Sequence, residues 1–268
     1  MGLIVEILDE GIDIRTNPHG GGVVSWTGTH ELNVDTSVKN NPTVDRETIP
    51  GVEIWSIFKR RRGCHRHDGN PLVHALKCEL KWRFKSENDR KAVERQFNKI
   101  AEKFVREHHH DITLIVPSTN RLNNYILDVI LEKEPDIQYI EGLVKKLRTE
   151  EVYAMASEGD SAFMKKYADD PDNALDELAE YLDEMDQKHD GLFVRNLIIN
   201  DEMRNVLDKT LKRSDMVPAR VANKLNGSDV LILDDTISRG QTIKEMVKLI
   251  PDSYSPKSIT VLTLFSNA

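Results

Sequence analysis

The stretch that decides the fold reads Val230-Leu231-Ile232-Leu233-Asp234-Asp235-Thr236-Ile237-Ser238-Arg239-Gly240-Gln241-Thr242. Its four aliphatic residues predict a buried strand, and two carboxylates follow at the carboxyl end of that strand. A short turn with hydroxyl groups and a glycine then leads into a predicted helix over 240–249. In an open α/β sheet, ligands bind outside the carboxyl ends of the strands. The two acids are therefore placed to meet a ligand.

The turn after the acids has the features of an anion site. Successive backbone N–H groups at a helix N-terminus bind anions, and Ser238 and Thr242 add hydroxyl donors. Gly240 lets the backbone approach the anion closely. Carboxylates beside such a turn suit a phosphorylated sugar, because they can accept hydrogen bonds from sugar hydroxyls while the phosphate occupies the turn.

The surrounding sequence alternates strands and helices. A β-branched run over 111–116 ends at Pro117 and predicts a buried parallel strand, which a helix over 121–133 and a strand over 137–140 follow. A helix over 86–106 has Ser86 as N-cap, and 258–265 is the last strand. This alternation predicts an α/β fold with an open, mostly parallel sheet flanked by helices.

Two further regions differ from this α/β pattern. Short β-type segments at 3–8, 11–15, 23–26 and 52–58 predict a small β-rich hood over residues 1–62, which precedes an α/β domain over 63–268. The hood is followed by a helix predicted at 71–84. Inside the α/β domain, residues 158–190 carry a net charge of −9. Leucines at helical spacing there, and a helix expected over 201–213, predict a helical acidic insertion at about 158–213, with Asp172 or Asn173 as cap.

Composition narrows the class of protein. The 268 residues carry a formal net charge of −8, but residues 57–106 alone sum to +9. Overall charge therefore excludes no polyanionic partner. No apolar run approaches the ~20 residues of a membrane span, and the N-terminus lacks the features of a secretory signal. With only two cysteines, we expect a cytoplasmic protein without a disulfide framework.

The 230–242 stretch resembles the 5-phosphoribosyl-1-diphosphate (PRPP) signature of type I phosphoribosyltransferases. The resemblance implies that Asp234 and Asp235 act in catalysis by binding the ribose 2′ and 3′ hydroxyls. It also implies that the following loop wraps the 5′-phosphate. The loop residues are Thr236, Ile237, Ser238, Arg239, Gly240, Gln241 and Thr242. Ser238 stands where 6-oxopurine salvage enzymes carry a further Asp, which argues against that subclass.

A narrower resemblance, to the ComF-type competence-associated branch, rests on 68–77, 112–117, 121–124 and 143–149. It implies a diphosphate site made by the loop after the 111–116 strand and by a mobile basic loop. Its residues are Ser118, Thr119, Asn120, Arg121, Lys145, Lys146 and Arg148. Mg²⁺ is the expected cofactor and would be held mainly by PRPP and water. The branch has a Gln where this chain has Val152.

Three functional hypotheses stay open. The first is a phosphoribosyltransferase that moves phosphoribose from PRPP to a nitrogenous acceptor and releases diphosphate. The second is a PRPP or nucleotide sensor without catalysis. The third is a DNA-associated accessory protein that contacts nucleic acid through residues 59–106, where Lys59 and Arg60 begin a basic run and Trp55, Trp82 and Phe84 could stack on bases. A homodimer is among the expected assemblies.

Histidines and cysteines offer a competing reading. Five of them could be zinc ligands, although their spacing fits no strong paired-cysteine pattern. They are Cys64, His65, His67, His74 and Cys78. The run His108-His109-His110 is expected to be a solvated helix end.

Overall fold

The computed structural model describes most of the chain. The described residues are 2–7, 22–27, 34–60, 70–77, 82–118, 122–193, 198, 200–207, 209–214, 216–237, 240–250 and 254–266.

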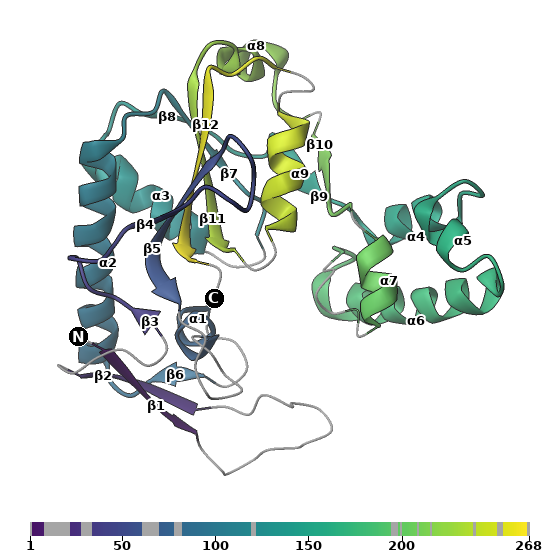
Figure 1. Ribbon diagram of the computed structural model, residues 1–268, viewed down its shortest axis with the longest axis horizontal. Helices are drawn as coiled ribbons and strands as arrows, with labels where there is room; N and C mark the ends of the chain where they lie inside the picture. Colours follow the sequence, from purple (N-terminus) through teal and green to yellow (C-terminus); the bar gives the residue numbers. More distant parts are fainter. Residues whose placement is uncertain are drawn as a thin grey trace.

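A mostly parallel sheet of seven strands, all within the described residues, forms the centre of the molecule (Figure 1). The strands are β3 (Val34–Asp35), β4 (Thr43–Asp45), β5 (Glu53–Arg60), β7 (Ile112–Ile115), β8 (Gln138–Ile140), β11 (Asp229–Thr236) and β12 (Ser258–Phe265). Their order is β3-β5-β12-β11-β7-β8, and β4 pairs with β5 off this path. The pairs from β5 across to β8 are parallel, whereas β3 and β4 run antiparallel to β5. The predicted α/β class with a mostly parallel sheet and flanking helices is confirmed.

The side chains of β11 alternate between two hydrophobic cores. Leu231 and Leu233 pack in one core with residues of α1 (Asn70–Lys77), α2 (Glu87–Glu107) and α3 (Leu122–Lys133). Val230 and Ile232 pack in the other core with residues of α8 (Ala219–Ala222) and α9 (Gln241–Leu249). All four are at most 1% exposed. Burial on both faces explains why this strand is a continuous aliphatic run.

The helix predicted at 86–106 is α2, and Ser86 caps it by accepting a hydrogen bond from the Asp89 N–H. The helix predicted at 71–84 is wrong at its C-terminal end, because α1 ends at Lys77 and Arg83–Phe84 form strand β6. β6 pairs with Val23 and Val24 of β2 (Gly22–Thr27). Pairing with a distant strand overrides a local helical pattern here.

The N-terminal residues divide between two sheets. β1 (Gly2–Ile7), β2 and β6 form a three-stranded sheet of their own, whereas β3, β4 and β5 belong to the central sheet. The boundary at residue 62 stays a prediction, but the strand just before it is an integral part of the α/β sheet. The predicted strand at 11–15 lies outside the described residues.

A separate group of helices projects to one side of the sheet (Figure 1). This helical unit consists of α4 (Thr149–Ser157), α5 (Ala162–Lys166), α6 (Pro171–His189) and α7 (Asp201–Val206). It has its own hydrophobic core, to which Phe163, Leu178, Met185 and Met203 contribute. Asp170, and not Asp172 or Asn173, is the N-cap of α6.

An antiparallel ribbon of two short strands joins the helical unit to the sheet. β9 (Val144–Lys146) leads into α4, and β10 (Leu211–Arg213) leads back from α7. The helix predicted over 201–213 is therefore wrong after Val206, because Leu211–Arg213 pair with β9. Within the described part of the chain, none of the helices combines the length and apolar character needed to cross a membrane.

Candidate functional site

Asp234 and Asp235 lie at the carboxyl end of β11, in the middle of the sheet. Each is only 8% exposed. The Asp235 N–H donates to Asp234 Oδ1 at 2.9 Å. The last residues of β11 thus present two neighbouring carboxylates where the parallel strands end, as the sequence predicts.

Three side chains from other elements approach this pair. Lys77, the last residue of α1, forms an ion pair with Asp235 over 2.9 Å between Nζ and Oδ2. Ser118 follows β7 and donates its hydroxyl to Asp235 Oδ2 at 3.4 Å. Lys146 of β9 interacts electrostatically with both acids. Lys77 has no role in the sequence-based assignment, although it lies in the 68–77 stretch that carries the family resemblance.

Burial and charge shift the proton affinity of this cluster. Burial raises the pKa of Asp234 to about 7, and the neighbouring charge of Asp235 adds to the effect. Lys77 and Lys146 oppose the rise. Burial also lowers the pKa of Lys146, although both carboxylates act against that change. Such shifts are common where the geometry serves a ligand.

Two residues of the connection between β11 and α9 are described at its ends, Ile237 and Gly240, and they lie near β5 and near Thr48 in the turn before β5. Arg60, the last residue of β5, donates from Nη2 to the Ile237 carbonyl at 2.7 Å and from Nε to the Ser266 carbonyl at 2.6 Å. Gly240 has a φ of +69°, and a Cβ there would lie 2.9 Å from Cγ2 of Thr48. Only glycine fits both the left-handed backbone and the close contact.

Arg60 belongs to the basic run that is expected to contact nucleic acid, but its side chain is buried in the structure. It is 8% exposed, and its guanidinium points to backbone carbonyls near the candidate site. Burial lowers its pKa from the usual value. Arg60 therefore supports the backbone at Ile237 and Ser266, and little of its side chain is exposed for a contact with nucleic acid.

The remaining loop residues begin the next helix. Gln241 and Thr242 open α9, with Gly240 as N-cap. Ser238 and Arg239 lie outside the described residues. The hydroxyl of Thr236 is buried and has no hydrogen-bond partner among the described residues. An unsatisfied hydroxyl at the start of an expected phosphate loop is a group that a bound anion could satisfy.

A cavity of about 360 Å³ is lined by Ser118 and Lys146, the two residues that also interact with the acid pair from β7 and β9. Its walls come from the loop after β7, the β9–β10 ribbon and the helical unit. They are Pro117, Ser118, Val144, Lys145, Lys146, Arg148, Glu151, Leu192 and Lys212. Four of these side chains are cationic and one is acidic, so the cavity favours an anion.

The basic residues of the cavity do not form the loop that the resemblance implies. Lys145 and Lys146 belong to β9 and pair with Lys212 and Leu211 of β10. Arg148 is the N-cap residue of α4. Lys212 forms an ion pair with Glu151 and is a cavity residue that sequence reasoning missed. Its position opposite Lys145 follows only from the ribbon pairing.

The loop after β7 is described only in part. Pro117 and Ser118 line the cavity, whereas Thr119, Asn120 and Arg121 lie outside the described residues. The buried Asn123 donates from Nδ2 to the Val116 carbonyl at 2.8 Å and thereby ties α3 to the end of β7.

The alternative metal site is not assembled within the described residues. No group of three His, Cys, Asp or Glu side chains that could hold a metal ion occurs among them. Cys64, His65, His67 and Cys78 lie outside that part of the chain. The expectation for the histidine run is wrong at His110, which is 5% exposed and stacks on Phe104.

Comparison of the chain with protein-family models, with curated proteins and with solved structures gave no match.

Proposed function

We propose that the protein binds PRPP with Mg²⁺ and transfers its phosphoribosyl group to a nitrogenous acceptor, releasing diphosphate. The observation that carries the proposal is the position of two buried carboxylates at the end of β11, beside a cavity rimmed by Lys145, Lys146, Arg148 and Lys212. A phosphorylated sugar diphosphate needs acceptors for its hydroxyls and donors for its two anionic ends. The two acids supply the acceptors, and the basic cavity residues and the N-terminus of α9 supply the donors.

Each part of the site has a role in this proposal. Asp234 and Asp235 accept hydrogen bonds from the ribose hydroxyls. The Thr236 hydroxyl and the N-terminus of α9 bind the 5′-phosphate. The basic cavity binds the diphosphate and stabilises the negative charge that grows on it as the glycosidic bond breaks.

Magnesium fits this set of residues as a ligand-held ion. The site offers hard oxygen donors in Asp234 and Asp235, and a Mg²⁺ ion bound to substrate phosphates usually keeps several waters. When bound, the ion would neutralise diphosphate charge. The carboxylates would hold the sugar hydroxyls and stay within reach of the ion's waters.

A calorimetric titration tests the proposal. PRPP with Mg²⁺ is titrated into the wild type, into Asp234→Asn/Asp235→Asn, and into Asp229→Asn, whose acid lies at the opposite end of the same strand. We expect binding to the wild type and to the control, and at least a ~100-fold loss in the double variant, because several charge-assisted hydrogen bonds disappear. Equal heats in the wild type and the double variant would remove the assignment.

A diphosphate-release assay with nucleobases and amines then distinguishes transfer from sensing. Release with at least one acceptor supports transfer. Binding without release across the whole panel favours the sensor.

A further inference from the structure

Glu245 of α9 links two parts of the candidate site that lie apart in the sequence. Its side chain is 9% exposed. The carboxylate accepts hydrogen bonds from the Thr210 N–H at 2.7 Å, from the Leu211 N–H at 2.8 Å and from the Thr210 hydroxyl at 3.0 Å. One buried acid therefore binds the backbone where the chain returns from the helical unit and enters β10.

The Thr210–Leu211 step in turn holds β9. The Thr210 carbonyl accepts from the Leu147 N–H at 2.9 Å, and Leu211 pairs with Lys146. Lys146 is, with Lys77, one of the two lysines whose charge acts on the acid pair. A short chain of contacts thus runs from α9 through Glu245 to Lys146 and the basic cavity.

The other end of this chain is the loop expected to bind phosphate. Glu245 lies in the second turn of α9, whose N-cap is Gly240. A helix moves as a rigid element over such a short distance, so a shift at its N-terminus also moves Glu245.

We propose that Glu245 is a positioning residue, which fixes the β9–β10 ribbon to α9 so that the phosphate loop and the basic cavity are held in one geometry for the same ligand. This inference rests on the proposed PRPP site. The same ribbon joins the helical unit to the sheet. Glu151 comes after β9 in the chain and Leu192 comes before β10, and both residues line the cavity. Glu245 therefore also sets the position of that wall.

A carboxylate suits this position better than an apolar side chain. Within the described residues it accepts from two backbone N–H groups and one hydroxyl, and an ionised carboxylate only accepts. A methionine has a similar length but no oxygen acceptor, so it would leave the N–H groups of Thr210 and Leu211 without this acceptor. Glu245→Met therefore keeps the approximate side-chain length and removes the anchoring.

The test combines amide hydrogen exchange with a double-mutant cycle. In Glu245→Met we expect the amides of 144–147 and 210–213 to exchange at least ~10-fold faster than in the wild type, while those of β11 keep their protection. We expect PRPP affinity to fall ~10-fold in Glu245→Met and in Lys146→Met. In the double variant the fall stays near ~10-fold, because both changes remove the same contribution.

Asp229→Asn is the matched control, since it removes a carboxylate at the far end of β11 and leaves the ribbon intact. Thr210→Val gives a second route if Glu245→Met does not fold, because it removes only the hydroxyl donor. It should show a smaller change in the same direction.

Unchanged exchange in the ribbon of Glu245→Met or Thr210→Val overturns the inference, whether or not PRPP binds. Additive losses of affinity in the cycle also overturn it, because Glu245 would then act independently of Lys146. A wild type that does not bind PRPP refutes the proposed function, and the exchange result still decides the anchoring role.

Discussion

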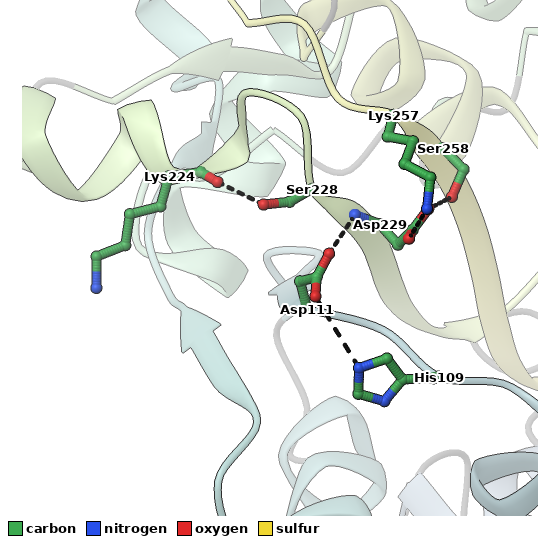
Figure 2. A network of polar contacts seen from close by, with 7 residues as sticks. All are labelled: His109, Asp111, Lys224, Ser228, Asp229, Lys257 and Ser258. Atoms are coloured by element: carbon green, nitrogen blue, oxygen red, sulfur yellow. Dashed lines mark hydrogen bonds and ion pairs between the residues drawn. The ribbon is translucent and has the colours of Figure 1, made fainter.

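The two ends of β11 carry the same kind of side chain in opposite surroundings. At the amino end, Asp229 bonds to Lys257 and Ser258, and its N–H donates to the Asp111 carboxylate (Figure 2). These partners lower the pKa of Asp229. At the carboxyl end, burial and a second acid raise the pKa of Asp234 to about 7. The same strand thus has a surface carboxylate with close partners at its amino end and a pair of buried carboxylates at its carboxyl end.

The two ends of β11 differ in how their charges affect the stability of the fold. Charges at the amino end meet partners that the fold itself supplies, so they need nothing further. At the carboxyl end Lys77 pairs with Asp235, but ionisation of the buried Asp234 beside this second acid still costs stability in the unliganded fold. A ligand that brings hydroxyl donors and Mg²⁺ would relieve this cost.

The two ends also respond to pH in opposite directions. His110 precedes β7 on the amino side, and burial lowers its pKa to about 4. Between pH 4 and 6.5 the unfolded state binds more protons at this residue, so His110 makes stability rise with pH. At Asp234 the unfolded state binds fewer protons between pH 4 and 7, so stability falls as pH rises. In the wild type the two slopes partly cancel.

Asp234→Asn should have the largest effect on this balance. The variant lacks the acid whose ionisation is disfavoured in the folded state, so it should be more stable than the wild type at pH 8, by at most about 4 kcal/mol. Urea unfolding from pH 4 to pH 8 measures the free energy of unfolding of both proteins. Over this range the stability of the variant should rise more steeply with pH than that of the wild type. A variant less stable than the wild type at pH 8 would contradict the raised pKa.

His110→Gln tests the opposite slope. Removing the imidazole should abolish about 3 kcal/mol of pH dependence between pH 4 and 6.5. The variant's stability should then rise less with pH than that of the wild type, because the His110 contribution no longer opposes that of Asp234. The same unfolding series gives the answer, with His109→Gln as an exposed control. Parallel curves for His110→Gln and the wild type would rule out a buried neutral histidine.

Lys77→Met should destabilise the fold through the acid pair at the carboxyl end of β11. It leaves Asp235 without its ammonium partner, and we expect a loss of about 2 kcal/mol, less than for a fully buried pair because both side chains keep some contact with solvent. In an Asp235→Asn background the same change should cost less than half as much. Equal costs in both backgrounds would show that the ion pair does not stabilise the fold.

Asp229→Asn should have the smallest effect. Its partners are largely exposed, so the loss should stay below about 1 kcal/mol and shrink further in 1 M salt. Unfolding midpoints at low and high salt measure this. A large, salt-insensitive loss would show that the amino end also depends on buried charge.

Local patterns predicted most of the α/β body. The aliphatic run of β11, the cap at Ser86 and the glycine at 240 each act through neighbours in the chain, and the structure has the strand, the helix and the turn there. The acid pair was found for the same reason, since its position at the strand end is a local property.

Sequence reasoning failed where partners are distant. Two predicted helices extended into residues that form β6 and β10, because strand pairing decided their conformation. Arg60 bonds to a carbonyl 177 residues away, and Glu245 to a backbone N–H 35 residues away. No local pattern indicates such partners.

The sequence by itself determined that two acids end a buried strand, because burial and turn chemistry are encoded within about a dozen residues. Only the tertiary structure decided which cations face those acids and how the helical unit contributes a wall to the cavity. Electrostatic and hydrogen-bonding partners depend on distance in space, and folding alone brings Lys77, Lys146 and Glu245 to the same end of the sheet.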